Sequence, residues 1–167
     1  GDKNRMSYDA GISYIKNVLE ATKTLLKNPN DLDTRSIIMM GASLSTSSRL
    51  GIGKEEAYAY DIYELEFLPE KLFGSSYRRS LTSIFPRFLE AMGKRHKEDV
   101  RKYYLDVFGF DSSIEESSRK LVALFSDFGV DMYYDGIINR EQVGCIPCDT
   151  ELDENEIFEM INGLIRK

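Results

Sequence analysis

Residues 77–92 read YRRSLTSIFPRFLEAM, and this stretch indicates the fold class of the chain. Its apolar residues Leu81, Ile84, Phe85 and Phe88 recur at i, i+3, i+4 and i+7, which places them on one face of an α-helix. A half-buried β-strand would instead alternate apolar and polar residues at every second position. The spacing therefore predicts an amphipathic helix over residues 77–92.

The same helical spacing recurs along nearly the whole chain. No segment alternates convincingly with a period of two, and no repeat of about 20–50 residues is visible. The pattern therefore predicts an all-α, multi-helix bundle in a single helical domain that covers residues 1–167. We expect helices over residues 12–26, 31–50, 55–72, 77–92, 96–108 and 113–128, and a last helix announced by Asp153 and Glu156.

Prolines, glycines and short polar residues set the expected boundaries. Pro29 should end the first helix, because proline disfavours helical backbone in the residue before it, and Asn30 or Asp31 can then cap the second helix. Residues 51–53 read GIG and should end that second helix. Pro69 should kink or restart the third helix, since it lacks the amide donor.

Two further local patterns concern a cap and the core. Ser112 with Glu115 is a candidate capping box for the helix that follows. Met39 and Met40 belong to the apolar run over residues 37–40, which predicts that both methionines are core residues.

The composition is that of an ordinary globular protein with a real core. Of the 167 residues, 42% are hydrophobic and 30% are charged, and the formal net charge is -6. A net negative charge argues against non-specific binding to nucleic acid or to an anionic membrane, since both need a basic face. No apolar run approaches the roughly 18 residues of a membrane span, and no signal peptide is recognisable. We therefore expect a cytoplasmic protein without a nucleic-acid or membrane partner.

The cysteines and the one histidine are weak candidates for chemistry. Cys145 and Cys148 form a Cys-Ile-Pro-Cys run, which in a redox protein of the thioredoxin type would follow a strand and precede a helix. Polar residues follow the pair instead, so a loop is the expected setting. His96 lies in a run of charged residues and is expected at the surface near a helix N-terminus.

One region of the chain resembles a known enzyme family. Residues 63–69 read YELEFLP, residues 73–78 read FGSSYR, and residues 84–86 read IFP. This arrangement resembles the iron-containing alcohol dehydrogenases, in which a histidine, a second histidine four residues later, a turn of small residues and a third histidine followed by glycine precede a proline. The resemblance implies the C-terminal helical domain of that family, which is related to the dehydroquinate synthase-like fold.

The resemblance also implies that the metal site is degenerate. The first and third histidines of the family bind the metal, and Tyr63 and Tyr77 stand at these two positions here. Phe67 replaces the middle histidine and Arg78 replaces the glycine. The family's N-terminal nucleotide-binding domain has no counterpart in residues 1–167, because no strand leads into a glycine-rich turn and helix. We therefore expect no metal, no cofactor and no catalytic residue, and a separate or upstream nucleotide-binding domain as a possible partner.

Several interpretations of the former ligand positions stay open. Tyr63 and Tyr77 can fill the vacated pocket with hydroxyls bonded to each other, to Glu66 or to water. They can also line a small-molecule pocket with Glu66, Phe67 and Arg78. A third interpretation keeps metal binding through Tyr63, Tyr77 and a nearby carboxylate such as Glu66 or Glu70.

Arg78 has two interpretations of its own. Arg78 can grip an anion with the free amides at the start of its helix. We favour instead a plug of the old cleft, in which Arg78 reaches Glu66 or Asp61.

Two functions from different classes follow. In the first, the chain is the helical domain of an oxidoreductase resembling iron-containing alcohol dehydrogenases, without dehydrogenase activity of its own. In the second, it is a non-catalytic module that binds a ligand or forms a homo-oligomer. The sequence does not disclose a substrate or a partner.

Overall fold

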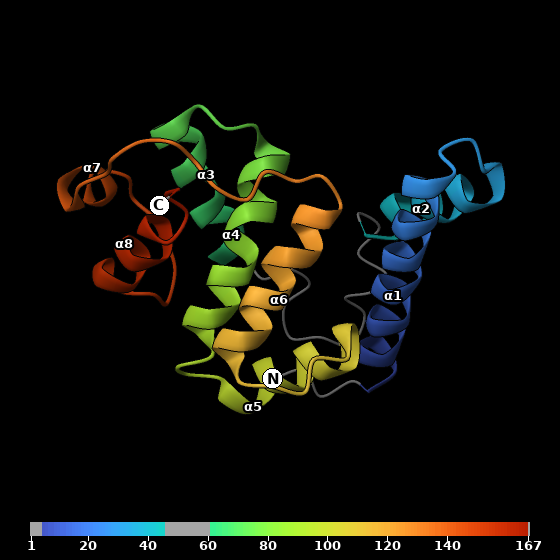
Figure 1. Ribbon diagram of the computed structural model, residues 1–167. Coiled ribbons are helices and arrows are strands. Elements are labelled where there is room, and N and C mark those ends of the chain that lie inside the picture. Colours follow the sequence, from blue (N-terminus) through green and yellow to red (C-terminus); the bar gives the residue numbers. More distant parts are fainter. Residues whose placement is uncertain (1–4, 46–60, 167) are drawn as a thin grey trace. The chain divides into compact units, whose positions relative to one another are not determined.

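The computed structural model describes residues 5–45 and 61–166, and most of these residues are helical (Figure 1). The described part contains no β-strand, and its only β-pairing is an isolated parallel bridge between Tyr134 and Ile165. The all-α class predicted from the sequence is confirmed. The helices are α1 (Arg5–Lys27), α2 (Leu32–Ser45), α3 (Asp61–Phe73), α4 (Tyr77–Met92), α5 (Lys97–Tyr103), the π-helical segment η2 (Tyr104–Phe108), α6 (Ile114–Asp127), α7 (Arg140–Gly144) and α8 (Glu154–Asn162).

The chain divides into two compact units. The first comprises residues 1–58 and 103–109, and the second comprises residues 59–102 and 110–167. The single domain expected over residues 1–167 stays a prediction, and the two units are described separately below.

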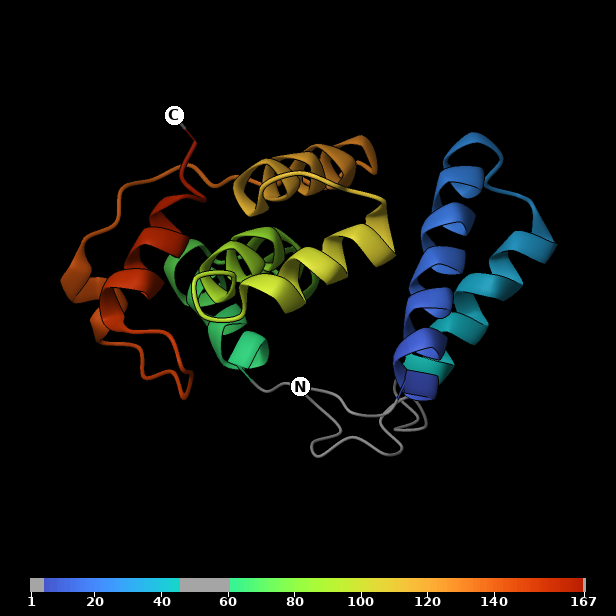
Figure 2. The ribbon, with the colours of Figure 1, turned by 90° about the horizontal axis from the view of Figure 1, so that it is seen from below.

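The first unit is a helical hairpin joined by η2. Helices α1 and α2 lie side by side in both views (Figure 1, Figure 2). They approach closely at Gly41, where a Cβ atom would lie 3.1 Å from Val18 Cγ2 and 3.2 Å from the Tyr14 hydroxyl. The Tyr8 hydroxyl donates a hydrogen bond of 2.8 Å to Asp106 Oδ2 in η2. The close approach of the helices at Gly41 and the hydrogen bond between α1 and η2 therefore both contribute to the packing of this unit.

The predicted start of α2 is confirmed, and its predicted end cannot be compared. Asp31 Oδ1 accepts a hydrogen bond of 2.9 Å from the Thr34 amide, as expected for an N-cap. The glycines at residues 51–53, which were expected to end this helix, lie outside the described residues. So does the stretch over residues 55–60 that was expected to begin the third helix.

The prediction that Met39 and Met40 are core residues is wrong. Their exposed fractions are 72% and 67%. The physical reason is that α2 packs on α1 along the face that carries Gly41, whereas both methionines lie on other faces of the helix. Four consecutive apolar residues cannot all share one face of a helix, so the run did not report burial.

The second unit contains the main hydrophobic core. Helix α4 packs against α3, α6 and α8, so it is central to this unit (Figure 1). Its predicted range, residues 77–92, agrees with the observed helix. The core is built from buried apolar residues of these helices and of the connecting segments: Leu65, Leu68, Ile84, Phe88, Ala91, Tyr134, Val143, Leu152, Ile157, Met160, Ile161 and Leu164.

Of the two helix caps that the sequence predicts in this unit, one is confirmed and the other lies one residue away. The cap of α6 is Ser113, whose hydroxyl accepts from the Glu116 amide, so the pair predicted at Ser112 and Glu115 is displaced by one residue. Ser112 instead exchanges a hydrogen bond with the Ser117 hydroxyl at 2.9 Å. The signal at the start of α8 is confirmed, because Asp153 and Glu156 form a complete capping box.

Proline does not break the helices of the second unit. Pro69 lies inside α3, and the helix continues to Phe73. Gly74 then turns the chain with φ of +63°, a left-handed backbone that glycine adopts without strain. None of the helices in the described residues is long and apolar enough to cross a lipid bilayer.

Candidate functional site

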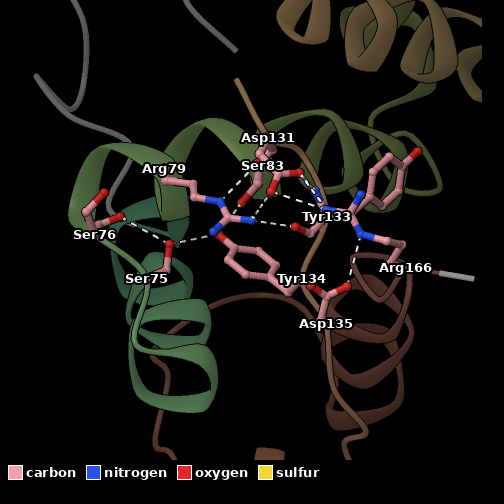
Figure 3. A network of polar contacts seen from close by, with 9 residues as sticks. All are labelled: Ser75, Ser76, Arg79, Ser83, Asp131, Tyr133, Tyr134, Asp135 and Arg166. Carbon is pink, nitrogen blue, oxygen red and sulfur yellow. Dashed lines mark hydrogen bonds and ion pairs between the residues drawn. The ribbon is translucent and has the colours of Figure 1, made fainter. Parts of the chain in front are cut away.

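A polar network around Tyr134 fixes the turn between α3 and α4 (Figure 3). The buried Tyr134 hydroxyl exchanges hydrogen bonds of 2.9 Å with Ser75 Oγ and with Ser83 Oγ. Its ring stacks on Phe73 with centroids 4.6 Å apart. Arg79 covers the ring with its guanidinium carbon 4.3 Å from the centroid. Both the turn and the first two turns of α4 are therefore held by one tyrosine.

The same network ties the C-terminal segment to α4 (Figure 3). Arg79 Nη2 donates to Asp131 Oδ2 at 2.9 Å, and Arg166 Nη2 donates to Asp131 Oδ1 at 3.1 Å. The Tyr134 amide donates to the Leu164 carbonyl at 2.8 Å. Sequence reasoning missed these residues, because the partners lie far apart along the chain and no local periodicity reports a parallel bridge.

Two aromatic side chains of helix α3 are partly exposed to solvent. Tyr63 and Phe67 lie one turn apart and have exposed fractions of 40% and 46%. Tyr77, the first residue of α4, has an exposed fraction of 50%. Tyr63, Glu66, Phe67 and Tyr77 together form what we call the Tyr63–Tyr77 surface.

Glu66 is the buried member of the Tyr63–Tyr77 surface. Its exposed fraction is 2%, and its Oε2 atom has no hydrogen-bond partner within the described part of the chain. Burial raises the pKa of the Glu66 carboxyl, and the charge of Glu70 raises it further. An unpaired buried polar group costs stability. No partner among the described residues compensates this cost for the Glu66 carboxyl.

The two tyrosines and Glu66 lie on α3 and α4, which pack against each other. Burial raises the pKa of the Tyr77 phenol, and the charges of Tyr63 and Glu66 raise it further. No hydrogen bond joins the Tyr63 or Tyr77 hydroxyl to the other or to Glu66 in the residues described. The two rings are thus neighbours at a surface, and not packing residues of a filled core.

The burial of Glu66 can be predicted from the helical spacing of its neighbours in the sequence. Ile62, Leu65, Glu66 and Pro69 are spaced at i, i+3, i+4 and i+7, which is the period of one helix face. Leu65 and Pro69 are fully buried, and Glu66 lies in the same stripe. A carboxylate inside an otherwise apolar stripe is the feature that would have identified it.

The plug expected at Arg78 does not form with Glu66. Arg78 is exposed, and its guanidinium makes no ion pair with Glu66 in the part of the chain that the structure describes. The side chain of Asp61, the other expected partner, is outside the described residues. The neighbouring Arg79 is the arginine that reaches across, and its partner is Asp131.

The start of α4 has no side-chain cap within the part of the chain that the structure describes. Ser76 is the N-cap residue, but its side chain makes no cap hydrogen bond. The first-turn amides of a helix have no intrahelical acceptor, and they carry the positive end of the helix dipole. Arg78 adds a full positive charge at the same end of the helix.

The Tyr63–Tyr77 surface does not fit a divalent metal ion. Among the described residues, no group of three or more His, Cys, Asp and Glu side chains could hold one. A tyrosine ligates a metal as a phenolate, and the raised pKa of Tyr77 disfavours that form. Glu66 is therefore a single buried carboxyl beside two phenols, which is a poor ligand set for iron or zinc.

The cysteines and the histidine have the surroundings expected of them. Both cysteines are free, and they follow α7 in an irregular segment. Burial raises the pKa of the Cys148 thiol, so this thiol is less reactive than an exposed one. His96 is at the surface, as predicted, with Nε2 3.3 Å from both carboxylate oxygens of Glu151.

Comparison with protein families and with curated proteins identifies no relative. No protein-family model matches the chain, and no curated protein matches it significantly. The resemblance to iron-containing alcohol dehydrogenases, with the positions of Tyr63 and Tyr77 as former metal ligands, therefore stays a prediction.

Proposed function

We propose that this chain is a non-catalytic, ligand-binding helical module whose binding site is the Tyr63–Tyr77 surface. The module lacks dehydrogenase activity of its own, in keeping with the resemblance to a family whose metal-binding histidines are replaced here by tyrosines. A separate nucleotide-binding domain and homo-oligomerisation both stay predictions.

The observation that carries this proposal is the unpaired Oε2 atom of Glu66. A buried carboxyl oxygen without a donor leaves a desolvation cost of about 1–3 kcal/mol uncompensated in the free protein. This oxygen has almost no accessible surface, so a ligand must displace a covering side chain before it can donate a hydrogen bond to the oxygen and recover that cost. The exposed rings of Tyr63 and Phe67 would supply apolar contact area beside it.

The arrangement favours binding over catalysis. Acid–base catalysis needs a titratable group within hydrogen-bond reach of the proton that it transfers, and in many active sites a hydrogen-bonded second group orients the first. Glu66 has no hydrogen-bonded partner of that kind among the described residues. Sites that bind small molecules combine apolar and aromatic side chains with a few polar groups, and Tyr63, Phe67 and the Glu66 carboxyl all belong to helix α3.

The test is a titration with 2-phenylethanol, which offers one hydroxyl donor and one aromatic ring. We expect saturable chemical-shift changes at Tyr63, Glu66 and Tyr77 in the nuclear magnetic resonance spectrum of the wild-type protein. Glu66→Met should remove them, because methionine keeps the length of the side chain and loses the acceptor. The matched control is Met39→Ala on the exposed face of α2, which should bind as the wild type does. Binding that survives Glu66→Met, or no binding to the wild type, would contradict the proposal.

A further inference from the structure

A cavity of about 520 Å³ lies in the second unit, where the end of α4, helix α5 and the start of α6 meet (Figure 1). Its volume falls in the range of about 300–1,000 Å³ that is typical of small-molecule sites. Helices α4 and α6 approach closely here, because a Cβ atom on Gly93 would lie 2.6 Å from Ile114 Cδ1. Apart from Gly93 and Ile114, every residue that lines the cavity is charged or is a serine.

Three of the side chains that line this cavity are cations. Lys97 and Arg101 lie one turn apart on α5, and Lys94 comes from the turn that follows α4. Lys97 and Arg101 are exposed and form no ion pair within the described ranges of the chain. Lys94 Nζ lies 3.7 Å from Glu156 Oε1, but Glu156 already accepts two hydrogen bonds from Arg95. Glu156 therefore compensates the charge of Lys94 only in part.

The two carboxylates that line the cavity do not balance the three cations. Glu90 Oε2 accepts a hydrogen bond of 3.0 Å from Arg87, an arginine that lies outside the lining. Glu115 accepts hydrogen bonds from its own amide and from the Ser113 hydroxyl, and these bonds lower the pKa of its carboxyl. Three cations and this one carboxylate therefore leave a local surplus of about two positive charges, although the chain as a whole has a net charge of -6.

Side chains, and not free helix amides, carry this positive surplus. The start of α6 is already capped, because the Ser113 hydroxyl accepts a hydrogen bond of 3.2 Å from the Glu116 amide. The Ser112 hydroxyl also lines the cavity, and it accepts a hydrogen bond of 3.3 Å from Lys120 Nζ. The cavity thus offers cations together with hydroxyl and carboxylate groups.

We propose that this cavity is a second binding site, for a small phosphate monoester that also carries hydroxyl groups. A phosphate monoester has a charge of about -1.5 to -2 at neutral pH, which matches the positive surplus. Arg101 suits its oxygens because a guanidinium pairs with phosphate in a bidentate manner, and Lys97 adds a point charge. The hydroxyl groups of the ligand exchange hydrogen bonds with Ser112 and Glu115. This site shares no residue with the Tyr63–Tyr77 surface.

Other anions match the cavity less well. A singly charged anion would leave part of the positive surplus uncompensated. A free phosphate ion would match the charge but would make no use of the serine hydroxyls and of the remaining volume. A long polyanion such as nucleic acid would be repelled by the net charge of -6 on the chain.

Three probes separate these anions in titrations of the wild-type protein at neutral pH and low ionic strength. The probes are glycerol 3-phosphate, inorganic phosphate and methanesulfonate, which carries one negative charge. Glycerol 3-phosphate should cause saturable chemical-shift changes at the backbone amides of Lys97, Arg101 and Glu115. We expect its affinity to exceed that of inorganic phosphate by about two- to tenfold, because its hydroxyls add hydrogen bonds. Methanesulfonate should bind more weakly than either.

Four variants test which charges hold the phosphate group. Lys97→Met and Arg101→Met should each weaken glycerol 3-phosphate by about two- to fivefold, as for an exposed ion pair. Glu115→Gln should tighten it by a similar factor, because this change removes a negative charge from the lining. Lys102→Met is the matched control, since Lys102 is next to Arg101 on α5 and does not line the cavity. It should leave the affinity unchanged, and all four variants should keep the wild-type urea midpoint.

Several results would overturn this inference. Equal losses of affinity in Lys97→Met and Lys102→Met would show diffuse attraction to basic side chains without a site. Equal affinities for glycerol 3-phosphate and inorganic phosphate would assign the cavity to the free ion and reject the ester. Tighter binding of a short single-stranded oligonucleotide than of glycerol 3-phosphate would point to a nucleic-acid surface instead. The absence of saturable binding by glycerol 3-phosphate would reject the site itself.

Discussion

Replacing Glu66 by methionine is predicted to stabilise the protein while it abolishes ligand binding. Methionine has an unbranched side chain of similar length, so it can occupy the same buried space without the polar atoms. The free protein then no longer bears the cost of a buried carboxyl oxygen without a partner, which is about 1–3 kcal/mol. For a protein of this size, such a gain corresponds to a rise in Tm of about 2–12 °C.

The pH dependence of this gain follows from the direction of the pKa shift. The folded pKa of Glu66 is raised above 4.5 by burial and by Glu70. Between 4.5 and the raised value, the unfolded chain releases its proton before the folded chain does, so stability falls as the pH rises. The penalty is complete above the folded pKa. Glu66→Met should therefore stabilise most at neutral pH and progressively less as the pH falls toward 4.5.

The assay must report on the second unit, because the chain contains two compact units. Urea unfolding followed through the resonances of α3 and α4 meets this need. Glu98→Met on α5 is the control, since Glu98 is exposed and its replacement should change stability by less than about 0.5 kcal/mol. A loss of stability in Glu66→Met above about 1 kcal/mol would refute the reasoning, because it would mean that Glu66 already has a stabilising partner.

Three further predictions concern the frame and the former ligand positions. Tyr134→Phe should cost about 1–3 kcal/mol in urea unfolding, because it leaves two serine hydroxyls without their shared partner; an unchanged midpoint would contradict this role. The hydrogen bond from Arg95 lowers the pKa of Glu156. The stability that this pair contributes is therefore present above pH 4.5 and is lost as the pH falls through the folded pKa. Arg95→Met should flatten the dependence of unfolding free energy on pH in that range. Elemental analysis after incubation with zinc should find no stoichiometric metal in the wild type, whereas uptake by the Tyr63→His, Tyr77→His double variant would support the resemblance; stoichiometric zinc in the wild type would contradict the degenerate site.

The sequence was sufficient for the helices but not for the contacts that join them. Residues 77–92 show a wide apolar stripe, and the observed α4 has the predicted bounds, because an amphipathic helix is specified by local spacing. The prediction for Met39 and Met40 was wrong, because hydrophobicity alone does not determine which face of a helix packs against another element. The α6 cap was displaced by one residue because consecutive serines offer the same chemistry.

The candidate site was half visible in the sequence. Tyr63, Phe67 and Tyr77 were singled out through a resemblance, and the hairpin of α3 and α4 does bring the two tyrosines together with Glu66. The burial of Glu66, and the lack of an ion pair at Arg78 among the described residues, depend on packing between segments, which no single-helix pattern contains. Tyr134 lies outside any motif, although its hydroxyl fixes the turn that precedes Tyr77.

The most direct test of the central claim is to locate a bound ligand by nuclear Overhauser effects. With 2-phenylethanol added to the wild-type protein, we predict contacts from the ligand ring protons to the rings of Tyr63 and Phe67, and loss of these contacts in Glu66→Met. Contacts to a different part of the chain, or contacts that persist in Glu66→Met, would contradict the assignment of the Tyr63–Tyr77 surface as the binding site.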